Sequence, residues 1–185
     1  MQSNDKIARL VIGTGGRAAS HSSHPEIPSA PGAYLVEFQL ASDRRLTIGK
    51  LGTADFPAGA YLYQGSARGP GGLRARLLRH LGAEIAHPHW HIDHLHLVAR
   101  PAACGWLADW PGAKPPAALE CLWSQALAAL PGVGLPLCGF GASDCRRGCK
   151  AHLVHFQRPP YDQTILSLES VQAALSTVLA GANLR

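Results

Sequence analysis

The sequence AYLVEFQL, residues 33–40, alternates in the way that a β-strand does. Large apolar residues occupy one face and both polar residues lie on the other: Tyr34, Val36, Phe38 and Leu40 against Leu35, Glu37 and Gln39. Because successive side chains of a strand point to opposite faces of its sheet, this pattern predicts a half-buried strand. Two more strands are expected beside it, at 46–50 and 60–64, with a turn at 42–45 and a loop at 52–59.

Helices are expected downstream of these strands. Residues 73–81 place four leucines on one arc of a helical wheel, and residues 117–130 and 168–180 show similar apolar faces. Two further strands are expected at 90–98 and 152–156. This order of elements predicts an α+β fold, a small antiparallel β-sheet flanked by helices, with an extra C-terminal helix.

Composition excludes several classes of protein. Apolar residues make up 46% of the 185 residues, which is enough for a core, and no apolar run approaches a membrane span. The N-terminus lacks the apolar run and cleavage site of a secretory signal, so the five cysteines are expected to be reduced thiols or metal ligands in a cytoplasmic protein. We expect a flexible tail at 1–30, a domain at 31–157 and a helical extension at 158–185.

Basic residues are unevenly distributed along the chain. Lysine and arginine number 17 against 12 acidic residues, a formal net charge of +5. Four arginines and no acid lie between residues 68 and 79, namely Arg68, Arg74, Arg76 and Arg79. Such a cluster favours binding to a polyanion, and the alternative is a solvated helix face.

Short motifs occur in an informative order. The tripeptide Gly32-Ala33-Tyr34 lies on the first expected strand and Tyr63-Gln64-Gly65 on a later one. The following helix carries Arg76 and His80, four residues apart and therefore side by side, and Glu120 lies in the first turn of another helix. In these motifs the chain resembles the GIY-YIG nuclease superfamily.

A closer resemblance is to a poorly characterised GIY-YIG-like family of small proteins, sometimes found joined to endonuclease III domains. Among the phrases that carry it are Tyr61-Leu62-Tyr63-Gln64-Gly65-Ser66-Ala67, Trp90-His91-Ile92-Asp93 and a glycine- and cysteine-rich segment at 139–153. The resemblance covers residues 31–157. It implies a DNA endonuclease that hydrolyses phosphodiester bonds with the help of one divalent metal ion.

The resemblance also implies a role for each motif residue. Tyr34 or Tyr63 would help to activate the nucleophile. Arg76 would hold the scissile phosphate with His80 beside it, and Glu120 would bind Mg²⁺ or Mn²⁺. Chemistry supports the last two roles independently, because a guanidinium offers a planar fork to phosphate oxygens and one carboxylate with waters is a usual magnesium site.

Additional substrate contacts are expected around these motifs, at Ser66, Arg74, Arg79, His91 and Asp93. In an extended strand His91 and Asp93 share one face with His89. One interpretation is that they border the active groove and position substrate or water. The other is that the histidines of residues 87–96 are hydrogen-bonded groups near a sheet edge.

Cysteines gather near the C-terminal end of the domain. Cys138, Cys145, Cys149 and His152 lie in a glycine-rich segment, and thiolate and imidazole are ligands that Zn²⁺ prefers. The spacing is not a standard zinc-finger signature. A site for Zn²⁺ is one interpretation, and inward packing of Cys145 beside a turn at Ser143-Asp144 is the other. Cys104 and Cys121 are expected in the core.

Three functions remain open on the sequence alone. The first is a metal-dependent endonuclease, acting on branched, damaged or single-stranded DNA. The second is a non-catalytic nucleic-acid-binding module on the same fold, whose affinity would be electrostatic and dependent on salt. The third is a small zinc-binding structural or adaptor protein. The geometric condition for the first is that Tyr34, Tyr63, Arg76 and Glu120 open onto one surface.

Overall fold

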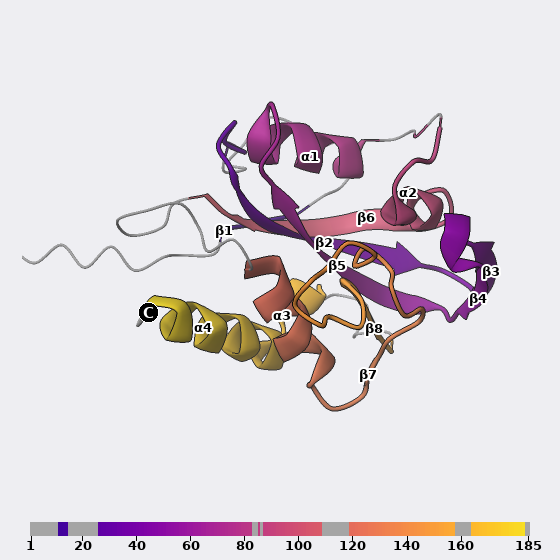
Figure 1. Cartoon of the computed structure of the whole chain (residues 1–185). Helices are drawn as coiled ribbons and strands as arrows, with labels where there is room; N and C mark the ends of the chain where they lie inside the picture. Colours follow the sequence, from indigo (N-terminus) through magenta and orange to yellow (C-terminus); the bar gives the residue numbers. More distant parts are fainter. Residues whose placement is uncertain are drawn as a thin grey trace, which may run out of the picture.

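The computed structural model describes residues 11–14, 26–82, 85, 87–108, 119–157 and 164–183, and within them it has the expected α+β fold (Figure 1). The strands are β1 (Val11–Thr14), β2 (Gly32–Leu40), β3 (Arg44–Thr47), β4 (Thr53–Phe56), β5 (Gly59–Ala67), β6 (Arg100–Leu107), β7 (Val133–Gly134) and β8 (Leu153–Phe156). The helices are α1 (Gly72–Leu81), α2 (His91–His96), α3 (Leu119–Ala128) and α4 (Glu169–Asn183), with short 3₁₀ turns η1 (Gly49–Leu51) and η2 (Ile165–Ser167).

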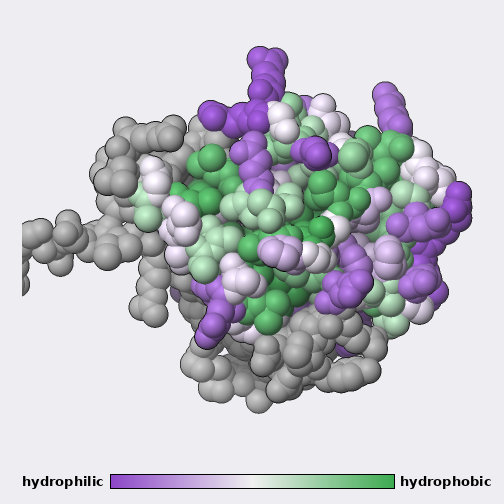
Figure 2. All heavy atoms as spheres, turned by 90° about the horizontal axis from the view of Figure 1, so that it is seen from below, coloured by the Kyte–Doolittle hydropathy of each residue, from purple (hydrophilic) through white to green (hydrophobic). Residues whose placement is uncertain are grey.

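Six of the strands form one antiparallel sheet in the order β1-β6-β2-β5-β8-β7, and β3 and β4 form a separate hairpin. Helices α1 and α2 cover one face of the sheet, and α3 and α4 cover the other (Figure 1). We call these the α1 face and the α3 face. Figure 2 views the molecule from below, where hydrophobic residues gather over the middle of the surface and hydrophilic ones project at its margins.

The central strand β2 is buried on both faces, which corrects the prediction of a half-buried strand. Leu35 and Glu37, on the mixed face, are both 0% exposed. Glu37 is covered because Gln39 Nε2 donates to its carboxylate at 2.7 Å and the Leu166 N–H, from η2, donates at 3.3 Å. Burial raises the pKa of Glu37. The polar face of this strand is therefore closed by a segment that is distant in sequence.

The histidine-rich stretch predicted as a strand at 90–98 is instead helix α2, followed by β6 from Arg100. Asp93 is the physical reason, since its Oδ2 accepts the backbone N–H groups of His89 and Trp90, both at 2.9 Å. A carboxylate that reaches back over three residues satisfies the free N–H groups at the start of a helix. Ile92 and Leu95 then face the core.

Two segments predicted as irregular also contain strands. Residues 53–56 of the expected loop pair with β3, where Arg45 and Asp55 form an exposed ion pair at 2.9 Å. Residues 11–14 of the expected tail pair with β6 as an edge strand. The carbonyls of Pro28 and Ala30 accept the N–H groups of Arg74 and Leu73 at the start of α1. Residues 1–10, 15–25 and 158–163 of the predicted tail and extension lie outside the described residues.

The C-terminal helix α4 packs on the α3 face through Val171, Leu175 and Leu179, which join the core of that layer. The expected helix at 117–130 is α3, whose first two expected residues lie outside the described ranges. No helix in the described part of the chain combines the length and hydrophobicity that crossing a bilayer requires.

Candidate functional site

Two tyrosines and a histidine meet on the α1 face of the sheet. The hydroxyl of Tyr34, from β2, lies 2.9 Å from Nε2 of His80, from α1. The ring of Tyr63, from β5, has its centroid 6.3 Å from that of Tyr34 and 5.9 Å from that of His80. Three elements that are far apart in sequence therefore place their polar ring atoms in one cluster.

A glycine makes this cluster sterically possible. Gly65 lies opposite Tyr34 in the pairing of β2 with β5. A Cβ added at Gly65 would stand 2.4 Å from Cζ and 2.5 Å from the hydroxyl of Tyr34, closer than non-bonded atoms approach. The tyrosine ring lies directly over the backbone of the neighbouring strand, which explains why the tripeptide Tyr63-Gln64-Gly65 ends in glycine.

Burial sets the protonation states in the cluster. It raises the pKa of Tyr34 well above its usual value, raises that of Tyr63 to about 12 and lowers that of His80 to about 4. At neutral pH Tyr34 and His80 are therefore both uncharged, and the Tyr34 hydroxyl shares a hydrogen bond with His80 Nε2. His80 Nδ1 is buried and has no hydrogen-bond partner among the described residues.

The burial of His80 predicts a pH-dependent stability. Below pH ~6.5 the unfolded chain protonates this histidine, while the folded protein resists doing so until about pH 4. The folded state should therefore lose roughly 3 kcal/mol as the pH falls through this window. Urea unfolding of the wild type and of His80→Gln at pH 7 and pH 4.5 measures this loss, which should be absent in the variant.

The matched control is His87→Gln, which removes an exposed histidine and should leave the pH dependence of the wild type unchanged. Equal pH dependence in the wild type and in His80→Gln would contradict the buried, neutral His80.

Arg76 provides a positive charge beside the cluster. It lies one helical turn before His80 on α1, and its guanidinium carbon stands 5.2 Å from the ring centroid of Trp90, a residue that is 46% exposed. A cation over an indole face is held in place electrostatically. Arg76 is close enough to lower the pKa values of Tyr34 and Tyr63, although burial outweighs it.

Glu120 brings a negative charge to the same place from the other layer. It lies in the first turn of α3 and is partly buried, and its Oε2 has no hydrogen-bond partner among the described residues. Burial is the largest cause of the raised pKa values of Tyr34 and Tyr63, and the charge of Glu120 raises both pKa values further. The charges of Arg76 and Glu120 thus act on these tyrosines in opposite directions. The unpartnered carboxylate oxygen of Glu120 could accept a hydrogen bond or hold a cation.

The other expected substrate contacts are placed differently. Asp93 is 0% exposed, and its Oδ2 accepts a 2.6 Å bond from Arg79 Nη2, so these two residues hold α1 to α2. Arg74 is exposed and paired with Glu26 at 3.3 Å. Ser66 is half-buried on β5.

His91 serves the local structure of a loop. Its Nδ1 accepts the backbone N–H of Gly141 at 3.0 Å, and its ring contacts Phe140. Phe140 in turn lies beside the ring of Tyr63. His91 therefore fixes the loop that covers one side of the tyrosine cluster.

A second cluster lies next to Glu120 and could hold a metal ion. It consists of Cys121, Cys145, Cys149 and His152, whose ligand atoms all lie within 4.8 Å of one another. Cys121 Sγ is 3.6 Å from Cys145 Sγ and 3.6 Å from His152 Nε2. Ligands at tetrahedral positions around zinc would be separated by roughly 3.8 Å at the usual bond lengths, so the spacing fits such an ion.

The surroundings of the cluster suit thiolate ligands. Burial alone would raise the pKa of Cys145, but the N–H groups of Arg147 and Cys149 outweigh it and the pKa is lowered. The N–H of Arg147 donates to the Cys145 sulfur at 3.4 Å. Burial raises the pKa of the Cys121 thiol, so a cation would be needed to keep that sulfur ionised.

The membership of this cluster corrects the sequence-based ligand set. Cys138 is exposed and is not part of the cluster, and its place is taken by Cys121, which was expected to be a core residue. Cys121 follows Glu120 directly and lies on the buried side of α3, so an apolar helix pattern concealed it. One feature of the sequence could have indicated Cys121: it directly follows Glu120, so a thiol lies beside the expected catalytic carboxylate.

Comparison with known proteins gives one family. The model of the Domain of unknown function DUF123 matches residues 33–173, which contain every residue of both clusters. No curated protein and no solved structure matches the chain significantly.

Proposed function

This chain belongs to the DUF123 family, and from its own geometry we propose that it is a metal-dependent nuclease that hydrolyses phosphodiester bonds in DNA. The observation that carries the proposal is the cluster of Tyr34, Tyr63 and His80, with Arg76 one helical turn before His80 on α1 and held over the ring of Trp90. Phosphodiester hydrolysis needs a proton acceptor for water and positive charge for the phosphate, and these residues can supply both when a divalent ion is bound.

Glu120 would hold the divalent ion, together with waters and a phosphate oxygen. When bound there, Mg²⁺ or Mn²⁺ would supply positive charge to the phosphate oxygens and to the nearby tyrosines. The chain itself would grip the phosphate through the guanidinium fork of Arg76, which the ring of Trp90 keeps in place.

Tyr34 and His80 would form the route for the proton. The Tyr34 O–H bond breaks and its proton passes to His80 Nε2, 2.9 Å away. The phenolate then takes a proton from a water molecule, whose oxygen forms a bond to phosphorus while the bond to the leaving sugar oxygen breaks, and that oxygen takes up the proton that His80 held. Positive charge from Arg76 lowers the pKa of Tyr34, and a bound phosphate anion would raise the pKa of His80, so each opposes one of the two pKa shifts that burial imposes.

The Cys121–His152 cluster requires a different ion, and we propose Zn²⁺ for it. Three thiolates and one imidazole are soft ligands that select zinc over magnesium. A site with four protein ligands is closed to substrate, so its role would be structural.

The proposal is tested by incubating labelled branched, duplex and single-stranded DNA with purified protein, with and without Mg²⁺ or Mn²⁺. We expect cleavage that needs the added ion and is lost in Glu120→Gln, which keeps the size of the side chain and removes its charge. DNA binding without cleavage under any of these conditions would support a non-catalytic binding module instead. Bound zinc with no affinity for DNA would support a structural or adaptor protein.

A further inference from the structure

A short loop between two of the cluster cysteines is held in a defined shape. Cys145 and Cys149 both belong to the metal cluster, and we call residues 145–149 the cysteine loop. Gly148 adopts a positive φ of 73°, which favours glycine and lets the chain turn back toward the cluster. Gln125 of α3 donates its side-chain N–H to the Arg147 carbonyl at 3.1 Å. The loop is thus tied to α3 both through the cluster and through this hydrogen bond.

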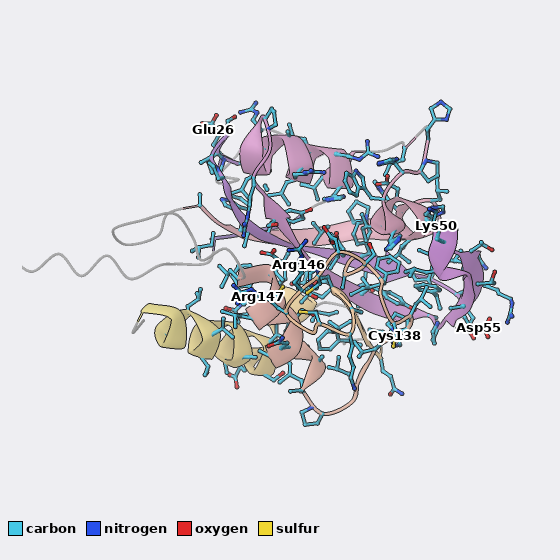
Figure 3. The ribbon with its side chains drawn as sticks, in the orientation of Figure 1. Glu26, Lys50, Asp55, Cys138, Arg146 and Arg147 are labelled. Atoms are coloured by element: carbon cyan, nitrogen blue, oxygen red, sulfur yellow. The ribbon has the colours of Figure 1, made fainter. Side chains whose placement is uncertain are left out.

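The cysteine loop presents two exposed arginines. Arg146 and Arg147 follow one another at its tip, and Lys150 is exposed just beyond it. None of the ion pairs found among the described residues involves these three cations. Figure 3 places Arg146 and Arg147 near α3 in the middle of the view, away from the hairpin residue Asp55 at its right margin.

The cluster links these arginines to the proposed catalytic carboxylate. Cys121, the residue after Glu120, has its sulfur 3.6 Å from that of Cys145, which directly precedes Arg146. The positive charges of the loop and the carboxylate of the active site are therefore joined through one small metal cluster.

We propose that the cysteine loop is a second phosphate-binding element, which grips the nucleic-acid backbone beside the scissile phosphate through Arg146 and Arg147. The inference rests on the proposed function for the identity of the substrate as a nucleic acid. Two adjacent guanidinium forks suit a chain of phosphates better than a single carboxylate, because each fork donates hydrogen bonds to two oxygens of one phosphate. An ion bound by the cluster would hold the cysteine loop in one shape, so that the guanidinium groups of Arg146 and Arg147 can both reach the nucleic-acid strand.

Salt-dependent DNA binding tests the inference in wild-type protein without added Mg²⁺ or Mn²⁺, where cleavage does not interfere. Each phosphate contact contributes about 0.9 to the slope of log K against log salt on duplex DNA. In the double variant Arg146→Ala/Arg147→Ala we expect the slope to become shallower by about 2. The control, Arg44→Ala/Lys50→Ala, removes the same charge from exposed residues at the β3–η1 end and should keep the wild-type slope.

A second variant tests the part played by the cluster. Cys145→Ser keeps both arginines but removes one ligand, so its slope should also become shallower, whereas that of Cys138→Ser should not. A wild-type slope in the arginine double variant, an equal change in its control, or no DNA binding by the wild type would overturn the inference. DNA binding with the expected slopes but no cleavage would overturn the nuclease proposal and leave this inference standing.

Discussion

Replacing Arg76 with alanine is expected to lower the rate of DNA cleavage at least ~100-fold, because removal of one preorganised charge that stabilises a transition state has effects of about this size or larger. Arg76 is the cation that acts on both tyrosines and on His80, so its loss should weaken phosphate binding and also make Tyr34 harder to deprotonate. The single-turnover cleavage rate as a function of pH measures both effects, and the rise of the rate with pH should move to higher pH.

Arg74→Ala is the matched control for this prediction. Arg74 lies two residues earlier on the same helix, but it is exposed and paired with Glu26 away from the tyrosines. We expect its cleavage rate to stay within about threefold of the wild type, since a surface ion pair of this kind contributes ~1 kcal/mol or less. Similar rates in the Arg76 and Arg74 variants would contradict the assignment of Arg76 to the active site.

Replacing Cys121 with serine is expected to release the ion of the cluster and to lower the melting temperature by at least ~10 °C, since zinc binding contributes many kcal/mol to the folding of small zinc domains. Cys121 joins α3 to the cysteine loop and to His152, so its loss separates three segments. Metal content by elemental analysis and the melting temperature by calorimetry measure the two effects together.

Cys138→Ser is the control, because this exposed cysteine lies outside the cluster. It should keep one zinc per chain and the wild-type melting temperature. Since Cys121 is buried and its replacement also alters packing, Cys149→Ser provides a second test at a less buried ligand. Stoichiometric zinc in either ligand variant would show that the four residues do not form the site.

The elements predicted correctly from the sequence are those with a clear local period. The strand at 33–40 and the leucine arc of 73–81 were identified because alternation and helical spacing are visible within a few residues. The burial of both faces of β2 was missed because the segment that covers Glu37, η2, lies more than a hundred residues later. A pattern within a few residues cannot indicate a contact between segments so far apart in the sequence.

The candidate site was predictable to a similar extent. Tyr34, Tyr63, Arg76 and Glu120 were identified from motifs whose order resembles that of a nuclease family, and the structure shows Tyr34, Tyr63 and His80 in contact. Helix α2 was missed because the pattern of residues 90–98 was interpreted as a strand and did not indicate that Asp93 would cap a helix. Cys121 was missed because a buried helix position and a candidate metal ligand look the same in a sequence.

The sheet carries Tyr34 early in the chain, while the carboxylate of Glu120 and the ligand His152 come much later. During synthesis a ribosome releases the tyrosines, His80 and Arg76 long before it releases these last groups. If the proposed roles hold, a growing chain would therefore lack the groups for phosphodiester hydrolysis until Glu120 and His152 have emerged.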